Sequence, residues 1–337
     1  MTIRLVVSLM IAVLGCSLAV AADDAAWTWA GVEILGNHAV PRSEIEMLIP
    51  IPIGGVWHVG DAPFWKDACA EVQRKFDFAA VVCGDIPVRV FDGRKAFLIV
   101  DVVEKGREGV MKFRDPPLGS VAFANDEMVR VNVELDSKVR AASMAGNFYN
   151  ESGQKGYLSY ENATGKNEDL SPLVDRLVQL VPQYRDNLFD VLRHEKDAKR
   201  RQRAAELLNW SGGDMQRTLR RALALLDDPD GGVRNNLSRF TIQFVGTVKS
   251  KRLRHHLIDA FVDQIGRPSH GDRNKGLYNL FEIARTVAGD RDYIRSRGSE
   301  SIRYLAENSV LFNVQGPAKD LLALLDPTAQ PEVVGSP

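Results

Sequence analysis

The stretch Phe78–Lys105, FAAVVCGDIPVRVFDGRKAFLIVDVVEK, decides the fold of the first third of the chain. Within it, Val88–Phe91 has the alternating pattern of a short strand. Asp92-Gly93 then signals a hairpin turn, because both residue types tolerate positive φ. Ala96–Val103 is an apolar run that breaks only at an aspartate, which is typical of a strand covered by other elements. The stretch therefore predicts two strands joined by a tight turn.

Proline at position 87 indicates where the first strand of this hairpin lies in the sheet. Pro87 has no N–H to donate, so the strand that follows it is predicted to lie at a sheet edge. Upstream, Trp29–Leu35 predicts another strand, and a short helix is expected to follow Ser43. Apolar residues four apart predict a second helix that ends near Phe76. Residues 27–105 are thus predicted to form an α+β domain with the order β-α-α-β-β.

The first 22 residues have the pattern of a signal peptide. A positive start at Arg4 precedes the apolar run Leu5–Leu14 and the small-residue site Ala19-Val20-Ala21. Cys16 after glycine resembles a lipidation site, although the leucine before that glycine does not fit. We therefore expect a periplasmic chain, with membrane contact only peripheral or through a lipid on Cys16. The net charge of -1 indicates no bulk attraction to nucleic acid.

Removal of the signal peptide leaves two cysteines, Cys69 and Cys83. In an oxidising compartment two such residues predict one disulfide bond. The loop between them would stabilise the fold by about 3 kcal/mol in the chain-entropy model. The alternative is two buried free thiols.

Residues 27–105 resemble a POTRA domain, the periplasmic module of outer-membrane assembly and two-partner secretion proteins. The matching features are the strand ending at Gly36-Asn37, the Ile53-Gly54 loop, the Phe76/Phe78 pair and the ending Val100–Glu104. The segment Cys83–Pro87 departs from the pattern as an insertion before the edge strand. The resemblance implies a domain that pairs its sheet edge with strands of partner chains.

An uncovered sheet edge presents unpaired N–H and C=O groups, which an extended peptide can satisfy. The partner-binding candidates are the residues of the edge strand, Val88, Arg89, Val90 and Phe91. The alternative is that Pro87 and Arg89 protect this edge against pairing.

The middle of the chain, residues 106–169, is predicted to be a linker or extended region. Asp115-Pro116-Pro117 is typical of a linker. Met128–Leu135, MVRVNVEL, alternates and predicts an isolated strand. A polar segment rich in Gly, Asn, Ser and Tyr then predicts a loop up to residue 169.

From residue 170 to 325 the apolar pattern changes to a helical period. Triplets at i, i+3 and i+4 begin at Ala204, Leu237 and Leu277, each after an acidic or polar turn, with partner helices between them. Helix pairs that repeat every roughly 30 to 45 residues predict an α-solenoid. The segment Leu225–Arg234, LLDDPDGGVR, makes this region similar to HEAT repeats. The resemblance implies an all-α HEAT-like solenoid, followed by a disordered tail over residues 326–337.

Two basic runs, Lys196–Arg203 and Lys249–His256, suggest a surface for an acidic partner or anionic head groups, or simply a solvated helix face. The sequence lacks H-E-x-x-H, paired C-x-x-C, Gly-rich phosphate-loop and G-x-S-x-G motifs. Ser152–Lys155 matches S-x-x-K but is predicted to lie in a polar loop rather than at a helix start, so no catalytic, metal or cofactor residue is assigned. We expect an interaction adaptor near an outer-membrane assembly or secretion machine rather than an enzyme. The alternative is an enzyme or ligand-binding protein with its site in residues 106–169, using Tyr157, Tyr160 or Glu161.

Overall fold

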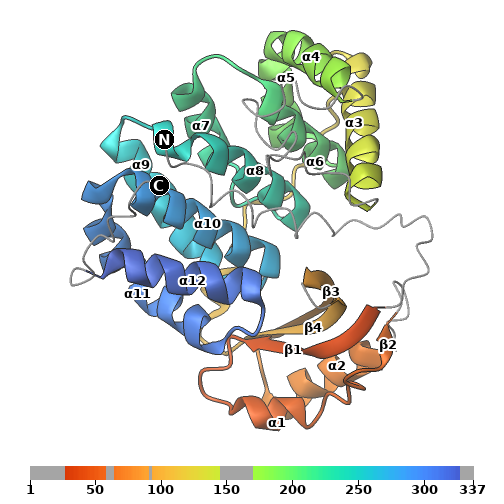
Figure 1. Ribbon diagram of the computed structural model, residues 1–337, viewed down its shortest axis with the longest axis vertical. Coiled ribbons are helices and arrows are strands. Elements are labelled where there is room, and N and C mark those ends of the chain that lie inside the picture. Colours follow the sequence, from red (N-terminus) through yellow and green to blue (C-terminus); the bar gives the residue numbers. More distant parts are fainter. Residues whose placement is uncertain (1–26, 58–63, 91–92, 145–169, 327–337) are drawn as a thin grey trace, which may run out of the picture.

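The computed structural model describes residues 27–57, 64–90, 93–144 and 170–326. A sheet domain lies at the bottom of Figure 1, and a curved stack of helices lies above and beside it. The signal peptide with Cys16, the residues 327–337 of the tail, and Tyr157, Tyr160 and Glu161 lie outside the described residues.

The sheet has four strands in the order β2-β1-β4-β3. They are β1 (Trp27–Leu35), β2 (Val56–Trp57), β3 (Ala80–Val90) and β4 (Gly93–Val103). β1 and β4 are parallel, and the other two pairs are antiparallel. The sequence predicted three strands, and it missed β2 because this strand has only two residues. The predicted insertion before the edge strand is also wrong, since residues 83–87 pair in register with β4 as part of β3.

Successive side chains of each strand point to opposite faces of the sheet, and both faces contain buried residues. One face packs on α1 (Arg42–Glu46) and α2 (Phe64–Phe76), with a core that includes Trp29, Ile34, Trp57, Val72, Leu98 and Val100. The other face turns towards the helical stack, and it carries two buried acids, Glu33 on β1 and Asp101 on β4. A sheet covered on both sides explains why the apolar run of β4 is almost continuous.

The structure joins Cys69 of α2 to Cys83 of β3 in a disulfide bond. This bond fastens the longer helix of the domain to its edge strand. At the end of β1, Gly36 has φ +86, and a Cβ there would lie 2.0 Å from the carbonyl oxygen of Val102. Only glycine fits this turn, because both the backbone conformation and the close approach exclude a side chain.

The prediction of an extended strand over Met128–Leu135 is wrong, because these residues lie inside α3 (Asp126–Met144). The buried positions of α3 are spaced as on a helix: Met128, Val131, Asn132, Leu135 and Val139. Asn125 begins the helix, since its side-chain oxygen accepts a hydrogen bond from the Glu127 N–H at 2.8 Å.

The remaining helices form the stack. They are α4 (Ser171–Leu180), α5 (Arg185–His194), α6 (Ala198–Leu207), α7 (Met215–Leu223), α8 (Gly231–Phe244), α9 (Lys251–Ile265), α10 (His270–Thr286), α11 (Arg291–Asn308) and α12 (Phe312–Leu325). The helices α6, α8, α10 and α12 pack in sequence as one layer, and α7, α9 and α11 form the second. One apolar core runs through the stack and includes Leu35 from the end of β1.

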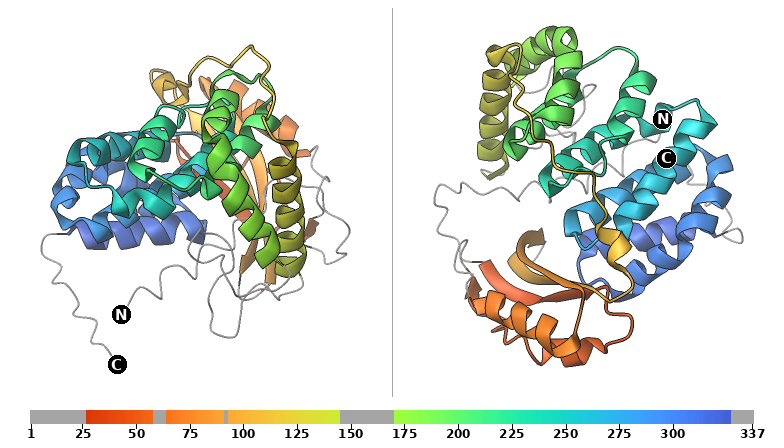
Figure 2. Two further views of the ribbon diagram at one scale, coloured as in Figure 1. Left: turned by 90° about the horizontal axis from the view of Figure 1, so that it is seen from above. Right: turned by 180° about the vertical axis from the view of Figure 1, so that it is seen from behind.

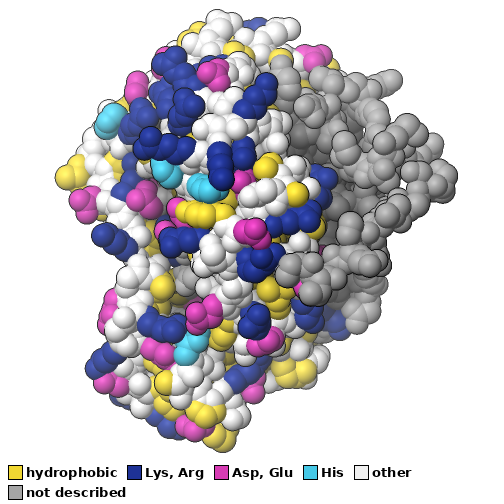
Figure 3. All heavy atoms as spheres, turned by 90° about the vertical axis from the view of Figure 1, so that its left-hand side faces the viewer, with side chains coloured by type: hydrophobic (Ala, Val, Ile, Leu, Met, Phe, Trp, Pro, Cys, Tyr) yellow, Lys and Arg dark blue, Asp and Glu magenta, His cyan; other side chains and the backbone are white. Residues whose placement is uncertain are grey.

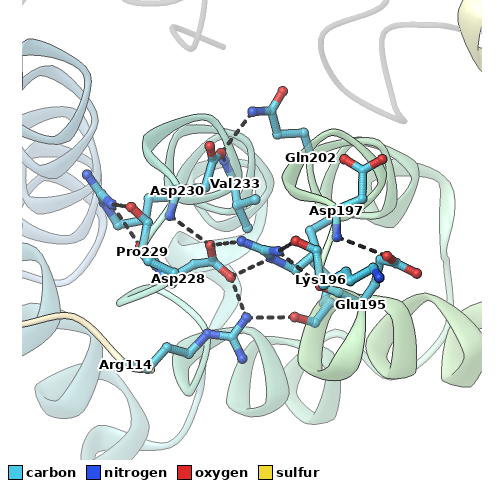
Figure 4. A network of polar contacts seen from close by, with 12 residues as sticks. Arg114, Glu195, Lys196, Asp197, Gln202, Asp228, Pro229, Asp230 and Val233 are labelled. Atoms are coloured by element: carbon cyan, nitrogen blue, oxygen red, sulfur yellow. Dashed lines mark hydrogen bonds and ion pairs between the residues drawn. The ribbon is translucent and has the colours of Figure 1, made fainter. Parts of the chain in front are cut away.

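A repeated arginine contact links successive helix pairs. An arginine in the first turn of a helix donates from Nη1 to the carbonyl oxygen six residues earlier. The rest of its guanidinium contacts an aspartate of a later element in three cases and of the earlier strand β4 in the fourth. The pairs are Arg201 with Asp228, Arg234 with Asp272, Arg254 with Asp290, and Arg273 with Asp101. Figure 4 shows the contacts around Asp228. We call this series the arginine ladder.

Candidate interaction surfaces

The edge strand β3 lies where Pro87 predicted, at the end of the sheet. Among the described strands, none pairs with its outer side. The Val88 side chain is only 1% exposed and packs with Ile99 and with Leu311 of the helical stack, whereas Val82 near the start of the strand is 44% exposed. Phe91 lies outside the described residues, and the side chains of Arg89 and Val90 are not described. Partner binding by this edge stays a prediction.

The joint between the sheet domain and the stack is formed by buried charges. Arg273 of α10 pairs with Asp101 of β4, and both side chains are almost fully buried. Next to them, Glu33 accepts hydrogen bonds from the Ser309 hydroxyl at 2.6 Å and from the Val310 N–H at 2.7 Å. Both acids interrupt apolar strands, and this interruption is the sequence signal that marks them. The two partner groups lie far away in sequence, so the sequence did not identify the joint.

Asp101 is the last aspartate of the arginine ladder. The aspartates that pair with Arg201, Arg234 and Arg254 belong to later helix pairs of the stack. Arg273 instead pairs with an aspartate on β4. Burial raises the pKa of Asp101 to about 6, although Arg273 acts in the opposite direction. The sheet domain therefore supplies the aspartate that a later helix pair supplies elsewhere in the ladder.

The connecting segment, residues 107–125, crosses the helical stack between the sheet domain and α3. The right-hand view of Figure 2 shows it running across the helices. Its backbone pairs with the stack: Arg114 N–H donates to Asp227 O at 2.9 Å, and Gly119 O accepts from Lys196 N–H at 2.8 Å. The Phe113 ring contacts the guanidinium groups of two stack arginines, at 4.3 Å and 5.1 Å from its centroid. The chain itself thus covers this face of the stack.

The two basic runs lie only partly on the surface. Arg201 and Arg254 are buried in the arginine ladder. Exposed cations do gather over α7 and α9, and Figure 3 shows this group on the upper part of its face. They are Arg217, Arg220, Lys249, Lys251 and Arg252.

Helix α10 is the most deeply buried polar element of the stack. His270 is buried, with Nε2 3.3 Å from the Asn313 side-chain nitrogen, and burial lowers the pKa of His270 to about 3. Lys275 is buried as well and donates to Asn274 Oδ1 at 2.8 Å, and burial lowers its pKa well below the ordinary value. The sequence did not predict this burial, because polar residues at a helix start usually face water.

A cavity of about 440 Å³ lies at the joint between the sheet domain, the connecting segment and α11. The ring of His38 packs against Tyr304 there, with 4.6 Å between ring centroids. The Tyr304 hydroxyl accepts a hydrogen bond from the Gly36 N–H at 2.8 Å. Burial, followed by the charge of Arg107, lowers the pKa of His38.

Within the described residues, no group of three or more His, Cys, Asp or Glu side chains is placed to hold a metal ion. In the same part of the chain, no helix has the length and apolar character needed to cross a membrane.

Comparison with known proteins does not assign the chain to a family. No family model matches the chain, and no curated protein matches it. Among solved structures, a designed armadillo repeat protein is similar with a TM-score of 0.38 and 13% sequence identity. That match covers 59% of this chain and 91% of the designed one. The arginine ladder and the two layers of helices define the stack, residues 170–326, as a helical repeat.

Proposed function

We propose that this protein is an exported interaction scaffold of the periplasm, in which the outer edge of β3 pairs with an extended segment of a partner protein. The proposed partner is a component of outer-membrane protein assembly or secretion, as the POTRA-like order of the sheet domain suggests. The helical repeats support a role in protein binding, because solenoids are mainly used for this purpose.

The observation that carries the proposal is the position of β3. It is an eleven-residue strand at the sheet edge, and no described strand pairs with its outer side. Its neighbour β4 and the disulfide bond to α2 hold it in place. A fixed strand of this length offers a row of backbone groups to an extended peptide.

Two proline substitutions test the proposal. Successive residues of an edge strand direct their N–H groups alternately to the neighbouring strand and outward. One of Gly84→Pro and Asp85→Pro therefore removes an outward N–H and leaves the pairing with β4 intact, whereas the other disturbs the sheet. Neither position belongs to the buried core.

Thermal unfolding shows which variant retains native stability. We expect that variant to lose the partners that the wild-type mature chain recovers by crosslinking from the cell envelope. If it recovers the same partners in the same yield, β3 is not the docking edge.

A further inference from the structure

The cavity at the joint has the location and size of a small-molecule site. Such sites favour domain interfaces and have volumes of roughly 300–1,000 Å³, and this one measures about 440 Å³. Its walls come from three parts of the chain: the end of β1 and β4, the connecting segment, and the helices α9 to α11.

The walls are fixed relative to one another by the contacts of the joint. Arg273 lines the cavity and pairs with Asp101 on the sheet domain. Tyr304 on α11 lines it as well and is bonded to the Gly36 backbone. The cavity is thus held open between elements that buried polar contacts keep in place, and a ligand would meet a preformed site.

The lining divides into an apolar part and a charged part. The apolar part consists of Leu35, Val102, Val103, Val110, Ile265 and Leu305. The charged part has cations on two walls, Arg107 on the connecting segment and Arg303 on α11. Glu300 and Glu307 on α11 supply negative charge. Within the described chain, none of these four exposed side chains makes an ion pair, so all four are available to a ligand.

We propose that this cavity binds a small zwitterion with an apolar body, namely an apolar amino acid or a short apolar peptide with free ends. The arginines receive the carboxylate, since a guanidinium matches carboxylate geometry. The glutamates receive the ammonium group. The apolar lining covers the side chains, and His38 with Tyr304 forms an aromatic wall at the side of β1. This binding is independent of strand pairing by β3.

Four probes measured by calorimetry on the mature chain test the proposal: leucyl-leucine, its N-acetyl form, its C-terminal amide, and free leucine. We expect the acetyl and amide forms to bind about tenfold more weakly than leucyl-leucine, because each lacks one charged end. Leucine binding as tightly as the dipeptide identifies a free amino acid as the ligand, and tighter dipeptide binding identifies a peptide. Equal binding of the acetylated, amidated and free dipeptides, or no binding at millimolar concentration, overturns the proposal.

Variants of the rim assign each end of the ligand. The double variant Arg107→Gln and Arg303→Gln should bind leucyl-leucine and its amide equally. The double variant Glu300→Gln and Glu307→Gln should instead bind leucyl-leucine and its acetyl form equally. Lys251→Gln, an exposed change on α9, is the matched control and should leave all affinities unchanged. Because every one of these side chains is exposed, the fold does not depend on them. Rim variants that keep the wild-type preferences would place the binding elsewhere and contradict the assignment.

Discussion

Single arginines in this protein hold together elements that are distant in sequence. Arg234 donates to both oxygens of Asp272, with distances of 2.6 Å to 3.0 Å, and to the carbonyl oxygen of Asp228 at 2.7 Å. Its side chain is 5% exposed, and that of Asp272 is 1% exposed. Losing one partner of such a pair leaves the other charge buried without compensation, which is far more costly than losing a surface pair.

We therefore expect Arg234→Ala to lower the free energy of unfolding by about 3–5 kcal/mol. Arg252→Ala, on the exposed side of α9, is the matched control and should change it by less than about 0.5 kcal/mol. Chemical denaturation of both variants measures the difference. Similar small losses in the two variants would show that the ladder does not stabilise the stack.

Asp101 should make stability depend on pH. Burial raises the pKa of this carboxyl to about 6, from 3.8 in a model peptide. Between these two values the folded chain holds a proton that the unfolded chain has released, so the free energy of unfolding falls as pH rises through this window.

The expected fall is on the order of 2 kcal/mol between pH 4 and pH 6.5. Asp101→Asn cannot titrate, so the difference between the wild-type and variant denaturation curves isolates this contribution. Parallel pH dependence in the two proteins would mean that Asp101 titrates normally in the folded state.

At the level of elements, the sequence predicted most of the helices and the position of the edge strand. The helical triplets beginning at Leu237 and Leu277 lie in α8 and α10 as expected. Pro87 correctly indicated an edge strand, because a missing N–H is a local property of the residue.

The wrong prediction for α3 and the missed contacts of the joint have physical reasons. In α3 the apolar residues fit both an alternating and a helical period over eight residues, and only the packing of Met128, Val131 and Leu135 against the stack decides between them. The ladder and the joint depend on pairs such as Arg273 and Asp101, which are far apart in sequence. No local pattern could bring them together.

The disulfide bond should matter most for the sheet domain. It joins α2 to β3 across 14 residues of sequence. Replacing both cysteines by alanine should lower the free energy of unfolding by roughly 2–3 kcal/mol, because the unfolded chain loses a constraint. Dithiothreitol should cause a similar loss in the wild-type chain and none in the variant. If dithiothreitol lowered the stability of both proteins equally, its effect would not come from the Cys69–Cys83 bond.

At the scale of the whole molecule, the sheet domain packs against the helical stack through α10 and the loop before α12. Asp101 takes the position of a repeat aspartate, and the loop from Ser309 to Leu311 packs on the same face of the sheet. At the edge of the sheet, no described strand pairs with the outer side of β3. The protein thus combines a helical support with an edge strand whose outer side pairs with no described strand, and this combination is the basis of the proposed scaffold.

Site-specific photocrosslinking in cells tests strand pairing at β3 most directly. A photoreactive residue is placed at Val82 on β3, and at Val133 on α3 as an equally exposed control, since the two side chains are 44% and 47% exposed. Strand pairing at β3 predicts that Val82 crosslinks to one partner polypeptide and that Val133 does not. It also predicts that the adduct disappears in the stable proline variant. An absent Val82 adduct, or one that the proline leaves unchanged, would contradict strand pairing at this edge.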